Sequence, residues 1–134
     1  MSVWGALQAR LVGFAGLAAL TGTRIYGGHL PQDVPLPAVS YSQVSEGREH
    51  AWGADSDLIS ARFQVDCWGA TTAAARQVSD QVIAALSRWG GTEDTTVVDQ
   101  VLLEGRTGPL VELPEETVHR HYRFLCEFVV HYRG

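Results

Sequence analysis

The sequence contains no lysine, and all ten of its basic side chains are arginine. Fifteen acidic residues against these ten give a formal net charge of −5. An acidic chain without a basic run is poorly suited to gripping nucleic acid, because clusters of Lys and Arg supply the attraction to phosphates. Arginine without lysine suits planar contacts with carboxylates and aromatic rings, although a GC-rich coding sequence produces the same bias.

Cysteine is also scarce, and no CxxC motif is present. Cys67 and Cys126 each lie on the apolar side of a strand-like alternation. They are therefore predicted to be buried thiols and not a disulfide or a metal-binding pair.

Long apolar runs are missing, and none approaches the length of a membrane span. Residues 11–20, LVGFAGLAAL, have the length of the apolar region of a signal peptide, but only Arg10 precedes them as a basic residue. We therefore expect no signal peptide, no membrane partner and a reducing cytoplasm. The chain has 134 residues, of which 46% are apolar and 19% charged, which predicts one globular domain over residues 1–134.

The clearest pattern covers residues 59–89. Odd positions from Ile59 to Cys67 are apolar and even positions are polar, which predicts a half-buried strand. After Gly69, apolar residues recur at three- and four-residue steps, which predicts a helix capped by Thr71 or Thr72 and ended by Gly90-Gly91. The predicted core residues are Ile59, Phe63, Val65, Val78, Val82, Leu86, Trp89, Phe124 and Phe128.

The remaining segments complete the order helix, strand, strand, helix, strand, strand. They are a helix over 3–20 weakened by Gly13 and Gly16, strands over 36–44, 95–104 and 120–132, and loops over 22–37, 45–58 and 105–114. This order predicts an α+β fold, in which a four-stranded, mainly antiparallel sheet is packed by two helices.

A catalytic constellation is missing from the sequence. There is no GxSxG, HExxH, phosphate-binding glycine loop or dinucleotide fingerprint. His119 and His121 lie two apart on one strand face, with His131 farther along, but no further ligand is indicated and solvated histidines are the simpler interpretation. We expect no catalytic residue, no metal site and no cofactor.

Two surfaces remain as candidates for contact with partners. One is the polar face of the strands over 59–67 and 120–132, where Leu125 and Val129 interrupt a mixed-charge surface. It is simple wet sheet in a monomer and a packing surface in an oligomer. The other is the loop over 45–58, where Trp52 either folds back onto the sheet or anchors a partner. The candidate interaction residues are Arg48, His50, Trp52, Arg62, Gln64, Asp66, Arg123 and Glu127.

Several short segments carry a family resemblance through their order and spacing. They are ALQARL near the start, Arg24-Ile25-Tyr26, Leu30-Pro31-Gln32, Leu36-Pro37 before Val39 and Tyr41, FQVDCW over 63–68 with its alanine-rich helix, Tyr122-Arg123-Phe124, Glu127-Phe128 and Tyr132-Arg133. Together they resemble the tail-completion proteins, or tail terminators, of long-tailed, siphovirus-type bacteriophages and phage-derived particles.

The resemblance implies an assembly role without catalysis. Members of this family form a ring of six subunits that caps the head-proximal end of the virion tail, ends tube growth and offers a surface for head docking. The implied partners are other copies of the chain, the tail tube protein on one face and a head–tail connector, or neck, protein on the other. Viral DNA would pass through the lumen without specific binding, and assembly would take place in the host cytoplasm.

Three other interpretations stay open at this point. The chain could be a neck protein on the head side of the joint. It could be a small metal-dependent enzyme that uses His119 and His121. It could also be a small cytoplasmic α+β module that binds an unidentified ligand.

Overall fold

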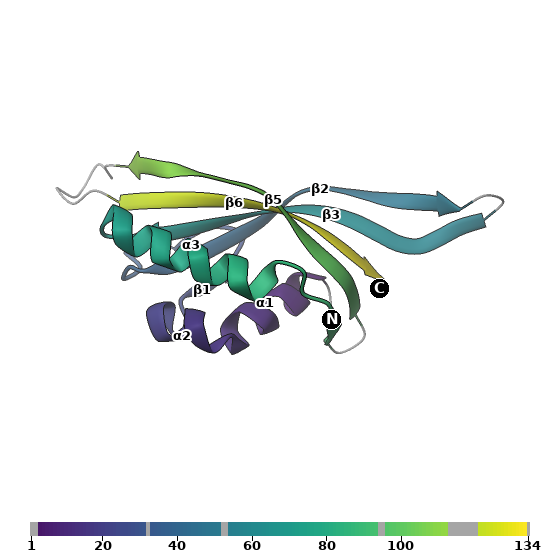
Figure 1. Ribbon diagram of the computed structural model, residues 1–134, viewed down its shortest axis with the longest axis horizontal. Coiled ribbons are helices and arrows are strands. Elements are labelled where there is room, and N and C mark those ends of the chain that lie inside the picture. Colours follow the sequence, from purple (N-terminus) through teal and green to yellow (C-terminus); the bar gives the residue numbers. More distant parts are fainter. Residues whose placement is uncertain (1–2, 32, 52–53, 94–95, 113–120, 134) are drawn as a thin grey trace.

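A strongly twisted sheet dominates the computed structural model, which describes residues 3–31, 33–51, 54–93, 96–112 and 121–133 (Figure 1). Its strands are β1 (Ile25–Gly27), β2 (Ala38–Ala51), β3 (Ala54–Gly69), β4 (Gly91–Glu93), β5 (Thr96–Glu112) and β6 (His121–Arg133). Their order across the sheet is β1-β2-β3-β6-β5-β4. The β1–β2 pair is parallel and the other neighbours are antiparallel.

Helices cover one face of this sheet and leave the opposite face bare (Figure 1). They are α1 (Val3–Gly13), α2 (Ala15–Thr21) and α3 (Thr72–Leu86). No single helix among the described residues is long and apolar enough to cross a membrane. The bent pair of α1 and α2 meets the length and composition of a span only when taken together, and the chain turns by 81° between them.

The prediction of a four-stranded, mainly antiparallel sheet with two helices is wrong. The described residues form six strands in a mixed sheet and three helices. The two missed strands have three residues each, too few for an alternation to be recognised. The predicted helix over 3–20 is broken at Phe14, whose backbone is extended (φ −84°, ψ 113°). The break lets α2 pack on α3, where a Cβ on Gly16 would lie 2.0 Å from the amide oxygen of Gln81.

Two segments predicted as loops are strand instead. Most of 45–58 belongs to the hairpin of β2 and β3, which projects beyond the helices (Figure 1). Residues 105–112 continue β5, with register shifts between Leu103 and Gly105 and between Thr107 and Leu110. Ladder pairing with β3 and β6 keeps both segments extended, and register shifts interrupt any regular alternation in polarity. In the second segment, Arg106 turns to the covered side, where it contacts the Phe124 ring and binds Ser79 and Asp80 of α3.

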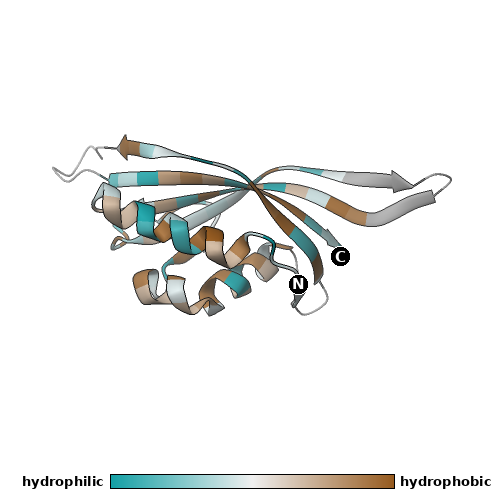
Figure 2. Cartoon of the chain, in the orientation of Figure 1, coloured by the Kyte–Doolittle hydropathy of each residue, from teal (hydrophilic) through white to brown (hydrophobic). Residues whose placement is uncertain are grey.

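The core lies between the helices and the covered face of the sheet. Alternating hydrophilic and hydrophobic bands run along α3 (Figure 2), and its buried side chains face β3 and β6. Phe63 and Phe128 are register partners at the centre and are 1% and 0% exposed. The predicted core residues Ile59, Phe63, Val65, Val78, Val82, Leu86, Phe124 and Phe128 are buried, and Trp89 is partly buried against them.

The start of α3 follows the sequence prediction and its end does not. The hydroxyl of Thr71 accepts a hydrogen bond from the amide of Ala74 at 3.0 Å, as expected of a cap. The helix ends at Leu86, before the predicted Gly90-Gly91. Arg88 takes the left-handed conformation (φ 62°) and donates its amide to the carbonyl of Val101 at 2.7 Å. Gly90 allows the backbone after α3 to lie close to β5, because a Cβ there would lie 2.7 Å from the Asp99 carbonyl oxygen.

Candidate assembly surface

The bare face of the sheet, meaning the side of β3 and β6 turned away from the helices, is the main candidate surface. The period of two in each strand puts the polar residues there together. Gln64 is the register partner of Glu127, Arg62 of Val129, and Asp66 of Leu125. The predicted residues Arg62, Gln64, Asp66, Arg123 and Glu127 all lie on this face. Their role in contacts with partners stays a prediction.

Most guanidinium groups on the bare face are paired with a carboxylate. Arg62 lies 2.7 Å from Glu104, Arg133 lies 3.0 Å from Asp99, and Arg123 lies 3.7 Å from Asp66. The pKa of Arg62 is raised, first by its hydrogen bond to Glu104 and then by the charge of that residue. The surface is therefore rich in charges that compensate one another and is not a basic patch.

The end of the bare face near Trp68 is rigidly packed. The Arg123 guanidinium lies 5.1 Å from the centre of the Trp68 ring. The Trp68 indole donates to the Ser40 hydroxyl at 3.1 Å, and Gln64 donates to Asp66 at 3.2 Å. An arginine held over an indole and against a carboxylate has little freedom to reach a ligand.

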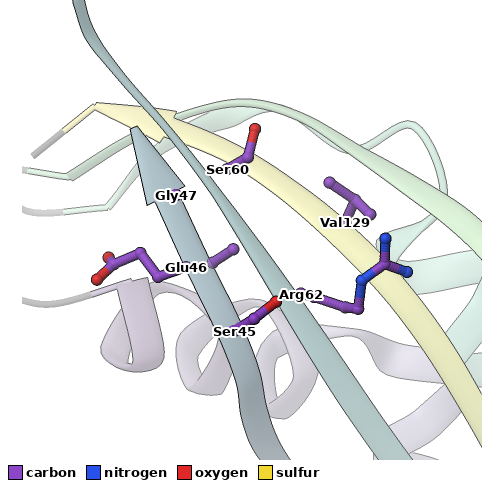
Figure 3. Close-up of a pocket in the computed structure, with 7 residues that line it drawn as sticks. Ser45, Glu46, Gly47, Ser60, Arg62 and Val129 are labelled. Carbon is purple, nitrogen blue, oxygen red and sulfur yellow. The ribbon is translucent and has the colours of Figure 1, made fainter. Parts of the chain in front are cut away.

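A shallow depression of about 280 Å³ lies at the root of the β2–β3 hairpin (Figure 3). Its lining residues are Ser45, Glu46, Gly47, Ser60, Ala61, Arg62 and Val129. Figure 3 shows that Arg62 and Glu46 point away from each other. Ser60 Oγ lies 2.9 Å from His131 Nδ1, while the carboxylate among the lining residues, Glu46, accepts a hydrogen bond from the Tyr132 hydroxyl. These described side chains are therefore not joined into the serine, histidine and carboxylate chain of a hydrolytic triad.

The metal hypothesis gains nothing from the described part of the chain. No group of three His, Cys, Asp or Glu side chains within it could hold a metal ion. His131 is bonded to Ser60, while His119 and Trp52 lie outside the described residues. Arg48 and His50 belong to β2, but the structure describes only their backbone.

The two cysteines are buried free thiols, as predicted. Burial raises the pKa of the Cys67 thiol well above its usual value, and the neighbouring Cys126 thiol adds to the rise. A neutral, buried thiol is a poor nucleophile and a poor metal ligand. These residues are part of the core and not of a site.

Exposed apolar side chains form a surface feature that the sequence analysis missed. The described large apolar residues with the greatest exposure are Val44, Val97, Leu102, Leu103 and Val111. One lies on β2 and four lie on β5, so they gather on the two outer long strands. The sequence stretch that could have indicated them is TTVVDQVLLE, in which odd and even positions both carry apolar residues, although one face of the strand is bare.

Comparisons with known proteins show the family and a similar fold. The family model described as "Tail completion protein gp17" matches residues 5–124. A chain in the solved structure "Virion of native gene transfer agent (GTA) particle" has a similar fold, with a TM-score of 0.77 at 18% identity, over 99% of this chain and 96% of that one. No curated protein matches the chain. Because the family model covers most of the sequence, this chain belongs to the tail completion protein gp17 family.

Proposed function

We propose that this chain is a structural component of a phage or phage-like tail, which forms a ring on the head-proximal end of the tail tube. The ring ends tube polymerisation and presents a docking surface for the head. The family match over residues 5–124 is the observation that carries this proposal. A tail tube protein on one side, a connector on the other and further copies of the chain are the proposed partners.

The shape of the described residues supports an assembly role. A single-layered hairpin projects from a sheet whose helices all lie on one face (Figure 1). The depression at its root is shallow, and the bare face offers a broad area for contact. A ring requires contact between two different patches on each subunit, so that rotation closes the assembly.

The charge pattern supports passage of DNA without retention. In a ring whose bare face lines the lumen, Arg62, Arg123 and Arg133 would each meet DNA already paired with a carboxylate. Glu127 is exposed on the same face and adds negative charge. Nonspecific binding of DNA needs cations that neutralise phosphates, and the arginine side chains of this face are already paired with its own carboxylates.

The decisive experiment is electron microscopy of particles made without this protein. The proposal predicts tails of excessive length and heads that are not joined. Tails of normal length beside unjoined heads would instead assign the chain to the head side of the joint, as a neck protein, and would overturn the terminator proposal.

A second experiment tests the ring directly. Purified protein is measured by light scattering, alone and with tail tubes from a lysate that lacks the protein, and is then imaged by negative stain. Rings, or protein confined to one end of each tube, are expected. A protein that forms no ring and binds no tube end would contradict the proposal.

A further inference from the structure

Each of the two outer long strands, β2 and β5, has an open stretch along its outer edge. The two stretches lie toward opposite ends of the sheet, measured along the strands. On β2, the short strand β1 pairs only with Val39, Ser40 and Tyr41, so the outer edge from Ser42 onward pairs with no described strand. On β5, the short strand β4 pairs only with Thr96, Val97 and Val98. Beyond the bond from Arg88 to Val101, the outer edge of β5 from Leu102 onward likewise pairs with no described strand.

The exposed apolar residues mark the same two edges. Val44 is 57% exposed on the open part of β2, whereas Leu102, Leu103 and Val111 are 40%, 37% and 54% exposed on the open part of β5. Val44 lies in a register shift, and the β5 residues flank two further shifts. Open edges with unpaired backbone groups and apolar side chains favour pairing with another strand.

We propose that the open edge of β2 (Ser42–Ala51) pairs with the open edge of β5 (Leu102–Glu112) of a second copy of this chain. The inference rests on the proposed ring and names the contact that would build it. Because the two edges differ, the contact is head to tail and can close into a ring.

Strand direction supports this pairing. Within the sheet, β2, β3, β6 and β5 alternate in direction, so β5 runs opposite to β2. If the next subunit keeps the same orientation relative to the ring axis, its β2 meets β5 in antiparallel fashion. The antiparallel alternation of the long strands therefore continues across the contact without interruption.

The offset of the two edges matches the tilt of a closed barrel. Ladder pairing puts Ser45 level with Arg62, Val129 and Leu102, and Thr107 level with Leu125, Asp66 and Ser40. Four residues of β3, from Arg62 to Asp66, thus separate Ser45 from Thr107 along the strands, a distance of about 14 Å. Four strand spacings per subunit cover about 19 Å across the strands. Their ratio gives a tilt of about 35°, at the lower end of the range of about 35–45° found in closed barrels.

The short strands delimit the paired stretch. With Ser45 opposite Thr107 of the next copy, so that both side chains face the bare side, β1 and β4 both lie just beyond the ends of the shared ladder. They cover the parts of β2 and β5 that the neighbour cannot reach. Each three-residue strand would then cover the part of an outer edge that lies outside the contact between subunits.

Cysteine cross-linking tests the contact. Ser45 and Thr107 are exposed, both face the bare side of the sheet, and they lie on opposite edges of one chain. The doubly substituted chain Ser45→Cys/Thr107→Cys, treated with a short bismaleimide alone and on tail tubes, should form a covalent ladder up to the ring size. A mixture of the two single variants should give dimers only. Native Cys67 and Cys126 are buried and should not react.

A matched pair controls for chance encounters. Ser45→Cys/Thr92→Cys places the second thiol on exposed β4, outside the shared ladder, and should give at least tenfold less cross-linked product. Rings that form normally but do not cross-link through Ser45 and Thr107 would overturn this inference and leave the proposed function intact. Cross-linking of the Ser45→Cys variant with itself would also overturn it, since β2 would then meet β2. Loss of all rings would overturn both.

Discussion

Arg62 on β3 reaches past Val129 of β6 to bind Glu104 of β5, with 2.7 Å between Arg62 Nη1 and Glu104 Oε2. The pair joins two strands that are not neighbours in the sheet. Its main effect is on the surface potential, because both side chains are well exposed to solvent. The guanidinium is compensated where a phosphate backbone would otherwise attract it.

Removing carboxylates from the bare face should create affinity for DNA. The variant Asp99→Asn/Glu104→Gln leaves the Arg133 and Arg62 guanidinium groups without these partners. We expect the native protein to be retained poorly by double-stranded DNA and the variant to bind it, with affinity that falls steeply as salt rises. Fluorescence anisotropy against salt concentration measures both.

The control for that prediction has the same change in net charge elsewhere. Asp33→Asn/Asp80→Asn removes two exposed carboxylates that lie outside the bare face. It should bind DNA far more weakly than Asp99→Asn/Glu104→Gln. Equal binding by the two variants would show that net charge matters and that position on the sheet does not.

Truncation of Phe63 should destabilise the fold. Phe63 is 1% exposed, opposite Phe128 and in edge-to-face contact with Trp4 at 5.5 Å. Phe63→Ala should lower the free energy of unfolding by about 3–5 kcal/mol, because a cavity replaces the ring. Urea denaturation measures this, and exposed Glu127→Ala should change it by less than about 0.5 kcal/mol. Similar losses for both variants would contradict the packing described here.

Loss of the helix cap should have a smaller, local cost. Thr71→Ala removes the acceptor for the Ala74 amide and should lower the free energy of unfolding by about 1 kcal/mol. Thr72→Ala is the matched control, because Thr72 is exposed and begins α3 without capping it. In thermal denaturation, Thr71→Ala should have a lower midpoint temperature than Thr72→Ala. The reverse ranking would show that the cap at Thr71 does not support α3.

The buried Cys67 thiol makes stability depend on alkaline pH. The pKa of Cys67 is raised in the folded protein, so on unfolding the thiol gains the ability to ionise above its usual pKa of about 9.0. The unfolded state then binds fewer protons, and the free energy of unfolding falls as pH rises past that value. Cys67→Ala should flatten this fall in urea titrations between pH 8 and about 10. An unchanged slope would refute the role of Cys67.

Sequence patterns predicted those elements that pack on the core. The strand ending at Cys67 and the helix after Thr71 each place apolar residues at the period of their own structure, because one side faces the covered layer. The long last strand was recognisable for the same reason.

The parts of the fold that escaped prediction are held by other forces. Register shifts interrupt the outer half of β2 and the far half of β5, so their side chains keep no regular alternation, although Arg106 of β5 still binds Asp80 of α3. Residues 25–27 join the sheet through ladder bonds with 39–41, which no local pattern reveals. Grouping Arg62 with Glu127 on one face needed only the period of two, but the pairing of Arg62 with Glu104 needed the strand order.

The projecting half of the β2–β3 hairpin has an evolutionary consequence. Val44, Ser45, Glu46 and Gly47 are all exposed, and the hairpin extends past the helices that stabilise the rest of the sheet (Figure 1). Substitutions there cost little folding stability, because few buried contacts depend on them. Selection can therefore reshape this segment to follow a changing partner while the core around Phe63 and Phe128 stays the same. Descendants of such a chain would drift fastest along this hairpin.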